Sequence, residues 1–369
     1  MRTWASFFCS VFLAFSLALS PAADAAPQKS KATATKTVKK KSAKAVKTKK
    51  VSAKKNVRKK AVVAASNKSV RKTAGKTTTS RKFAASKKVS KKRYAVRKVR
   101  GPSYAQLHGL RGSSDPLGLQ TTAVLAYDMD SNEVLYEKNA DERLPIASIT
   151  KLMTALVIVE SGVSLDQKFK VTKEDFVRSS ARSKLRNGMY LSRKQALHLA
   201  LMSSDNRAAH FLARTFPGGK ARFIRDMNTK AAMIGMFDSV FYDSIGLNNE
   251  NKSSALDLSR LLASAGEYDL IRELSTTPMA QIPVGRRLVT SRTTNSFVAN
   301  DNWDVSLQKT GLTTAAGYCL AMETEIGGKT VAIIFLDSPN KAARNQDAEK
   351  LKAWLSGQFM TASASEASN

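Results

Sequence analysis

The uneven distribution of charge decides which part of this chain can fold. Between Gln28 and Gly101 there are 29 Lys and Arg residues and no Asp or Glu, in a segment made mostly of Lys, Ala, Ser, Thr and Val. This composition offers too little apolar area to offset the entropy of ordering the chain, so we expect residues 26–110 to be disordered. From Pro102 to the end there are 31 basic and 28 acidic residues, a net charge of +3, and we expect this part to fold.

The basic segment, residues 28–101, therefore carries nearly all of the formal net charge of +32. Like charges along it should keep it extended. Two roles stay open: a solvated spacer, or an arm that holds the folded part near anionic envelope surfaces such as phospholipid or lipopolysaccharide headgroups. Strong positive charge also suggests nucleic acid, but an export signal argues against that partner, and we expect none.

Residues 1–25 have the three parts of a cleavable secretory signal. Arg2 supplies the positive start, residues 4–19 are apolar, and residues 23–25 (Ala-Asp-Ala) form a small-x-small cleavage site. The apolar stretch is shorter than the roughly 20 residues of a membrane-spanning helix. An uncleaved anchor is the alternative, but we expect the mature protein to be exported.

Cysteine and histidine offer no disulfide and no metal site. After cleavage only Cys319 remains, in an apolar run where burial as a small hydrophobe is the expected state. His108, His198 and His210 are far apart in sequence, and no Cys/His spacing is typical of metal ligands. We therefore expect neither a metal nor a cofactor.

Hydrophobic patterning predicts strands at both ends of the folded part and helices between them. Ser192 with Gln195 three residues later is a capping box that predicts a helix start. Strands on either side of a helical region suggest one sheet beside a helical lobe, an α+β fold. The predicted strands are residues 122–128, 133–138, 305–308, 318–325 and 330–336, and the predicted helices are residues 148–162, 193–203, 207–216, 221–233, 255–264 and 341–359.

Ser148 and Lys151 stand at the start of a predicted helix, after a lead-in that contains Pro145. Three residues apart, their side chains would share one face of the first turn. A serine hydroxyl becomes nucleophilic when a base takes its proton, and a lysine with a lowered pKa can be that base. The helix N-terminus adds partial positive charge where an oxyanion would develop. By itself, Ser-x-x-Lys also fits an ordinary helix start.

Two further motifs follow in order, Ser-Asp-Asn at 204–206 and Lys-Thr-Gly at 309–311. Each alone fits a common turn, cap or strand end. Together with Ser-x-x-Lys at 148–151 they form the motif set of penicillin-recognising serine enzymes. The chain resembles the low-molecular-mass penicillin-binding proteins, which are serine D-alanyl-D-alanine peptidases, and among them the endopeptidases of the penicillin-binding protein 7 type.

The resemblance covers roughly residues 115–357 and implies a peptidase domain at 111–360, followed by a disordered tail at 361–369. The implied fold is that of β-lactamases and DD-peptidases: a five-stranded antiparallel sheet flanked by helices, beside an all-helical region, with the site between them. It also implies that the exported enzyme works in a periplasm.

The resemblance implies a role for each motif residue in acyl transfer. Ser148 would attack the carbonyl of the penultimate D-alanine, and Lys151 would accept its proton. The charge of Lys309 would help to lower the pKa of Lys151, and Ser204 would relay a proton to the leaving amine. The remaining substrate contacts would come from Asn206, Lys309, Thr310 and Gly311, with the N–H groups of Ser148 and Leu312 as oxyanion hole.

The implied substrates are peptidoglycan peptides, with β-lactam antibiotics as covalent inhibitors. A class A β-lactamase would need a catalytic glutamate, but Glu267 and Glu273 lack the Glu-x-x-Leu-Asn context. The short C-terminal end favours an endopeptidase that cleaves D-alanyl-meso-diaminopimelate cross-links. A carboxypeptidase that removes the terminal D-alanine of pentapeptides is the alternative. A non-catalytic wall-binding protein is less favoured, because no motif residue is substituted.

Overall fold

The computed structural model describes residues 100–179 and 181–366, with side chains as far as Ala362. The predicted signal and nearly all of the basic segment lie outside the described residues, so those predictions stay untested. Within the described ranges, no helix is both long and apolar enough to cross a membrane.

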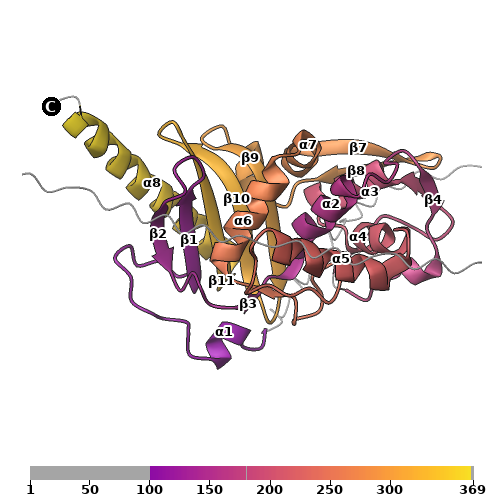
Figure 1. The fold of residues 1–369 in the computed structure, drawn as a ribbon, viewed down its shortest axis with the longest axis horizontal. Helices are drawn as coiled ribbons and strands as arrows, with labels where there is room; N and C mark the ends of the chain where they lie inside the picture. The colour runs from indigo at the N-terminus through magenta and orange to yellow at the C-terminus, as the bar shows by residue number, and fades with distance from the viewer. Residues whose placement is uncertain (1–99, 180, 367–369) are drawn as a thin grey trace, which may run out of the picture. The chain divides into compact units, whose positions relative to one another are not determined.

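A five-stranded antiparallel sheet organises the fold, as predicted (Figure 1). The strand order is β2 (Val134–Lys138), β1 (Ala123–Asp128), β11 (Lys329–Ser338), β10 (Gly317–Ile326) and β9 (Asp304–Thr313). β1 pairs with β11, Leu125 opposite Ile334, so the first and last strands of the folded part meet inside the sheet. β9, which carries the Lys-Thr-Gly motif, is an edge strand.

Both faces of the sheet are buried, which explains the nearly continuous apolar runs in β10 and β11. Side chains alternate between the two faces along each strand. One face packs on α8 (Lys341–Glu366) through Val124, Leu320, Met322, Ile333 and Phe335. The other packs on α6 (Ala255–Gly266) and the rest of the larger core through Leu125, Cys319, Ala321, Ile334 and Leu336.

A helical lobe lies beside the sheet (Figure 1) and consists of α2 (Thr150–Glu160), α3 (Arg193–Met202), α4 (Asn206–Arg214) and α5 (Gly219–Met233). α2 is buried on all sides from Thr150 to Ile158, as expected of a mostly apolar helix, and this burial includes Lys151. α3 begins at the predicted capping box: Gln195 N donates to Ser192 Oγ, and Ser192 N donates to Gln195 Oε1. The helix start was therefore predicted from local chemistry alone.

The structure corrects three predicted boundaries. Ser148 lies in a 3₁₀ turn, η1 (Ala147–Ile149), and α2 begins only after it. α8 continues to Glu366, past the predicted end at residue 359 and into the predicted disordered tail. α1 (Tyr104–Leu107) forms within the segment predicted to be disordered, because Ser103 caps it and Tyr104 N donates to Ala315 O.

Several short elements were not predicted, because their apolar patterns are too brief to stand out. They are α7 (Asp269–Thr276), η2 (Lys173–Asp175), η3 (Ser296–Ala299), the pair β3 (Leu144–Pro145) and β6 (Lys252–Ser253), the pair β4 (Lys168–Lys170) and β5 (Tyr190–Ser192), and the hairpin β7 (Met279–Val284) and β8 (Arg287–Arg292).

Candidate active site

The turn that carries Ser148 is held between two glycines from distant segments. Ala147 has a φ of 47°, a left-handed conformation that is unusual for a residue other than glycine. A Cβ on Gly246 would lie 1.8 Å from Ala147 O, and a Cβ on Gly311 would lie 2.8 Å from Ile146 O. Only glycine permits these approaches. Gly311 was predicted to admit the substrate; the structure shows that it also admits the nucleophile turn.

Lys151 is completely buried, and its Nζ lies 2.7 Å from Ser148 Oγ. Nζ also donates to Asn206 Oδ1 at 2.8 Å and to Ile245 O at 2.7 Å. These two acceptors satisfy both N–H groups of a neutral amine. The third position, which faces Ser148, then holds a lone pair that can accept the serine proton.

Burial lowers the pKa of Lys151 from 10.5 to about 7, because the charged form loses its hydration. The carboxylates of Asp243 and Asp205 act in the opposite direction. Burial is therefore the main cause of the lowered pKa of Lys151, and the interaction between the two lysine charges lowers the pKa of Lys309. The consequence is that a large fraction of Lys151 is neutral near pH 7 and can act as a base.

The Asp243 turn was missed by sequence reasoning, although it positions one partner of Lys151. Its carboxylate accepts hydrogen bonds from the backbone N–H groups of Ile245 and Gly246, at 2.8 and 2.5 Å. The turn thereby presents Ile245 O to Lys151. Asp and Gly are common in ordinary turns, and nothing in their spacing links them to Ser148.

The Ser-Asp-Asn motif forms the turn between α3 and α4. Ser204 has a φ of 57°, and Asp205 caps α4 by accepting from Arg207 N and Ala208 N. Asn206 is the first residue of α4 and contacts Lys151 through its Oδ1. The strained turn and the cap place Ser204 and Asn206 on the wall of the pocket in front of Ser148.

The Lys-Thr-Gly motif lies within β9, which continues past the predicted strand at 305–308. Lys309 is fully buried, and its Nζ donates to Thr310 O at 2.9 Å. Its pKa lies well below 10.5, mainly through burial and then through the charges of Lys151 and Arg344. A carboxylate brought close to it would raise that pKa again and favour the cation. Thr310 Oγ1 lies 2.5 Å from Thr294 Oγ1.

These parts surround a pocket of about 360 Å³. Six of the eight predicted site residues line it: Ser148, Ser204, Asn206, Thr310, Gly311 and Leu312. The other two, Lys151 and Lys309, are fully buried, and their Nζ atoms contact the lining residues Ser148 and Thr310. No Asp or Glu is among the described residues that line this pocket.

Arg344 also lines the pocket and was not predicted. It is only 2% exposed and donates to Asn345 Oδ1 and Cys319 O. Burial lowers its pKa to about 10. No described carboxylate forms an ion pair with it, so it is available to an anionic ligand. Arg344 lies in α8, far along the chain from the motifs, and only the fold reveals it.

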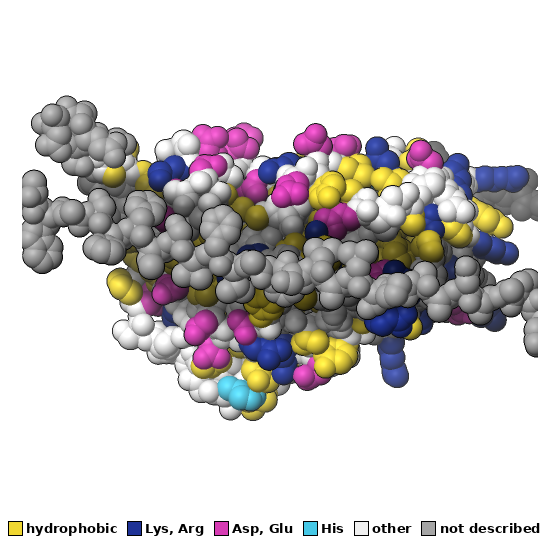
Figure 2. All heavy atoms as spheres, in the orientation of Figure 1, with side chains coloured by type: hydrophobic (Ala, Val, Ile, Leu, Met, Phe, Trp, Pro, Cys, Tyr) yellow, Lys and Arg dark blue, Asp and Glu magenta, His cyan; other side chains and the backbone are white. Residues whose placement is uncertain are grey.

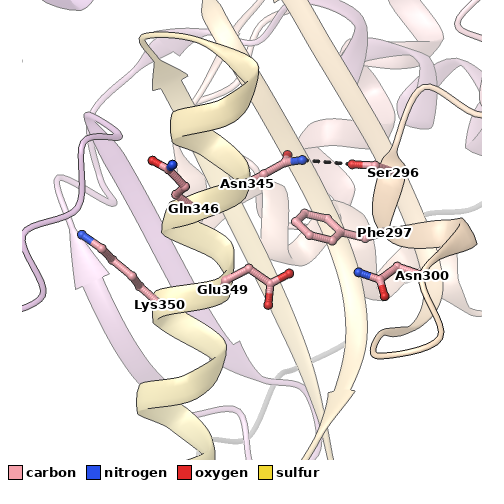
Figure 3. Close-up of a pocket in the computed structure, with 7 residues that line it drawn as sticks. All are labelled: Ser296, Phe297, Asn300, Asn345, Gln346, Glu349 and Lys350. Carbon is pink, nitrogen blue, oxygen red and sulfur yellow. Dashed lines mark hydrogen bonds between the residues drawn. The ribbon is translucent and has the colours of Figure 1, made fainter.

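A second hollow, of about 440 Å³, lies between η3 and α8 and contains none of the motif residues (Figure 3). Across it, Asn345 Nδ2 donates to Ser296 Oγ at 3.0 Å. Because Asn345 Oδ1 accepts from Arg344, this wall helps to orient Arg344 towards the motif pocket. The residues that line this larger hollow therefore help to hold Arg344 in the motif pocket.

Cys319 is fully buried, as predicted, and burial raises its thiol pKa to about 12. A thiolate is the reactive form of cysteine. Cys319 is therefore an inert core residue, whereas the hydroxyl-bearing Ser148 lines the pocket.

Comparison with known protein families matches residues 112–340 to the S11 peptidases, described as D-alanyl-D-alanine carboxypeptidase. The chain belongs to the S11 peptidase family. It is accordingly a serine-type D-alanyl-D-alanine peptidase, as the three motifs predicted.

Within this family the chain is similar to proteins of two named activities. It is 42% identical over 236 residues to a D-alanyl-D-alanine endopeptidase of Escherichia coli, covering 63% of this chain and 76% of that protein. It is 40% identical over 247 residues to a D-alanyl-D-alanine endopeptidase of Pseudomonas aeruginosa, covering 66% and 80%. A D-alanyl-D-alanine carboxypeptidase of Bacillus subtilis is 29% identical over 276 residues, covering 70% and 67%.

Solved structures of S11-like enzymes have the same fold. The Streptomyces K15 DD-transpeptidase superposes with a TM-score of 0.61 at 28% identity, covering 66% of this chain and 98% of that one. Penicillin-binding protein D2 of Listeria monocytogenes, in its ampicillin-bound form, superposes with a TM-score of 0.57 at 29% identity, covering 64% and 98%. The predicted fold class is confirmed.

Proposed function

We propose that this protein is an exported endopeptidase that cleaves D-alanyl-meso-diaminopimelate cross-links in peptidoglycan through an acyl-enzyme on Ser148. The observation that carries the proposal is the 2.7 Å contact between Ser148 Oγ and a buried Lys151 whose pKa is lowered to about 7. The two relatives with 40–42% identity are named endopeptidases, whereas the Bacillus subtilis carboxypeptidase is only 29% identical. This difference supports endopeptidase activity over carboxypeptidase activity.

In the acylation step, neutral Lys151 takes the proton of Ser148 as Oγ attacks the carbonyl of D-alanine. The N–H groups of Ser148 and Leu312 stabilise the oxyanion, and one such donor is typically worth about 3 kcal/mol in the transition state. Protonated Lys151 keeps its acceptors Asn206 Oδ1 and Ile245 O. The base is thus held in place in both protonation states.

The leaving residue carries a carboxylate next to the amine that is released. Thr310 and Arg344, which line the pocket, would supply donors for this carboxylate, and Lys309, buried beside Thr310, would add positive charge. Ser204 lies on the same pocket wall and passes a proton to the amine. When the C–N bond breaks, the acyl group stays on Ser148 and the amine departs with that proton. Water then hydrolyses the ester and regenerates the serine.

β-Lactams are proposed as covalent inhibitors, because the same acylation step opens their ring. A class A β-lactamase releases the acyl-enzyme with a glutamate that activates water. The described lining of the pocket offers no carboxylate for this task. We therefore expect a long-lived penicilloyl enzyme and little β-lactamase activity.

The cellular setting is part of the proposal. The signal at residues 1–25 would direct the protein to a periplasm, and the basic segment at 28–101 would act as a spacer or hold the enzyme near anionic envelope surfaces. Proteolytic release of the segment, followed by sedimentation with anionic vesicles, distinguishes the two roles.

The test of the proposed function is digestion of purified cross-linked muropeptide dimers and of pentapeptide monomers, with products read by mass spectrometry and Ser148→Ala as control. Dimers cut to monomers, with pentapeptides cut far more slowly, are expected. Loss of the terminal D-alanine from pentapeptides alone would identify a carboxypeptidase. No product that depends on Ser148 would contradict the enzyme assignment and favour a wall-binding protein.

A further inference from the structure

A third hollow, which we call the basic hollow, adjoins the pocket in front of Ser148. It has a volume of about 210 Å³, and its cationic side chains are Arg182, Lys184 and Arg292. The basic hollow and the pocket in front of Ser148 share four lining residues, Ala181, Ser203, Ser204 and Asn206. Figure 2 shows further Lys and Arg side chains over the end of the molecule where β4 and the tip of the β7–β8 hairpin lie, whereas Arg292 is at the other end of β8 from that tip.

The three cations are available to a ligand. Arg182, Lys184 and Arg292 are exposed, and no described carboxylate forms an ion pair with any of them. Asp205 is the one acid that lines the hollow. Its Oδ1 already accepts from the start of α4, and its Oδ2 accepts from Ser183 at 2.8 Å. The hollow therefore has an excess of positive charge.

The loop that bears Arg182 and Lys184 is fixed to the catalytic motif. Ser183 Oγ donates to Asp205, and Arg207 donates to Leu185 O while its guanidinium lies 3.7 Å from the ring centre of Phe176. On the other side, Lys184 donates to Thr290 O in β8. These contacts hold the loop backbone and the side chain of Lys184 close to Ser204, and thereby place Arg182 at the edge of the hollow.

The shared residue Ser204 links the hollow to the leaving group of the proposed reaction. Ser204, which would protonate the leaving amine, belongs to both hollows. Arg292 is two residues from Thr294, whose hydroxyl contacts Thr310 of the carboxylate-binding strand. A leaving group longer than one residue would therefore extend from Thr310 past Ser204 towards Arg182 and Arg292.

We propose that Arg182, Lys184 and Arg292 form a cationic subsite for the carboxylates of the leaving stem peptide, which makes cross-linked peptides better substrates than pentapeptides. This inference rests on the proposed function. Free D-alanine has a single carboxylate, which the Thr310 end would occupy. A leaving stem peptide carries further carboxylates, on its glutamate residue and at its C-terminus, and guanidinium groups pair well with them.

The first test compares kcat/KM of the full chain and of the Arg182→Glu/Arg292→Glu double variant on muropeptide dimers and pentapeptides. Each charge-assisted contact typically contributes about tenfold, so the ratio of dimer to pentapeptide kcat/KM should fall at least about tenfold. Arg186→Glu, on the same loop, and Arg287→Glu, on the same strand, lie outside the hollow and should change the ratio less than about twofold.

A second arm changes the ligand instead of the protein. Dimers whose leaving stem has amidated carboxylates should lose about tenfold in kcat/KM with the wild type, and nothing further with the double variant. Equal losses on dimers and pentapeptides, or the same loss from Arg186→Glu and Arg287→Glu, would overturn the subsite. A fluorescent penicillin that still labels Ser148 shows that each variant is folded.

A third arm keeps the subsite testable if the wild type proves not to cut dimers. Stem peptides with free and with amidated carboxylates are used to protect Ser148 from fluorescent penicillin, which needs no turnover. Stronger protection by the free carboxylates, lost in the double variant, supports the subsite even if the endopeptidase activity fails. Equal protection by both peptides overturns it.

Discussion

The cations inside the site and those at its rim differ in exposure, and the difference assigns them different tasks. Lys151, Lys309 and Arg344 are at most 2% exposed. Arg182 and Arg292 are exposed to solvent. Burial removes hydration and changes the protonation of a lysine, whereas an exposed arginine keeps its charge at every pH of interest. Burial therefore allows Lys151 to act as a neutral base, whereas the exposed arginines at the rim act only as fixed positive charges.

The two regions also differ in packing. The nucleophile turn is enclosed by the backbone around Gly246 and Gly311. The loop at residues 181–188, which bears Arg182 and Lys184 and is called the rim loop below, is attached through a few polar contacts, such as Ser183 to Asp205. Positions of the reacting atoms thus depend on close backbone packing, and those of the rim cations on side-chain contacts.

The largest effect should come from replacing the base Lys151 with a side chain that cannot give up its proton. Lys151→Arg places a guanidinium that stays protonated where a neutral amine is required. General bases typically contribute about 10²–10⁴-fold to rate, so we expect acylation by penicillin to slow by about that factor, measured by stopped-flow fluorescence. Lys194→Arg, on the exposed face of α3, is the matched control. A Lys151→Arg enzyme of normal rate would disprove the role of Lys151.

The packing difference can be measured with two glycines of similar backbone conformation. Gly246 has a φ of 82° and Gly188, on the rim loop, a φ of 88°. Gly246→Ala would place a Cβ against Ala147 O, and should destabilise folding by about 3 kcal/mol. Gly188→Ala meets nothing within 4 Å and should cost only about 1 kcal/mol of left-handed strain. Urea denaturation measures the free energy of unfolding of both variants. Equal losses in the two would contradict the prediction and show that the interior is as adaptable as the rim.

Arg344 provides the sharpest test of carboxylate binding inside the pocket. Arg344→Gln keeps a hydrogen-bond donor but removes the charge, and a charge-assisted hydrogen bond is worth about 1.5–3 kcal/mol. We expect kcat/KM for peptides with a free terminal carboxylate to fall about 10–100-fold, in steady-state assays. Peptides amidated at that carboxylate serve as the control, because they should be cut slowly by both enzymes. An equal loss on both peptides would show a purely structural role.

The smallest expected effect is that of pH on substrate preference, although pH should change the rate itself. Lysine is neutral above its pKa, so kcat/KM should rise about tenfold per pH unit below pH 7 and become level above it, following the lowered pKa of Lys151. The rim arginines stay charged throughout. The ratio of dimer to pentapeptide kcat/KM should therefore stay constant from pH 5.5 to 8.5. A ratio that changed together with the rate would contradict this separation.

Local chemistry was enough to predict much of the fold. The capping box at Ser192 and Gln195 and the strand pattern of β10 and β11 depend on neighbouring residues, and both were confirmed. The three motifs were recognisable because acyl transfer needs particular side chains at short spacings. Their meeting around one pocket was predicted by the resemblance and is a property of the whole fold.

The parts that could not be predicted depend on contacts between distant segments. Arg344 approaches the pocket because α8 packs across the sheet, and Ile245 O reaches Lys151 because the Asp243 turn presents it. The lowered pKa of Lys151 was predicted, but its cause is complete burial. Burial is a result of tertiary packing that spacing in the sequence does not encode.

The central claim is that Ser148, activated by buried Lys151, forms an acyl-enzyme. The most direct measurement is intact mass spectrometry of the protein after incubation with benzylpenicillin, followed by peptide mapping. We predict one penicilloyl adduct per chain, located on the peptide that contains Ser148, absent in Ser148→Ala and formed much more slowly in Lys151→Arg. An adduct on another residue, or none with the wild type, would contradict the account.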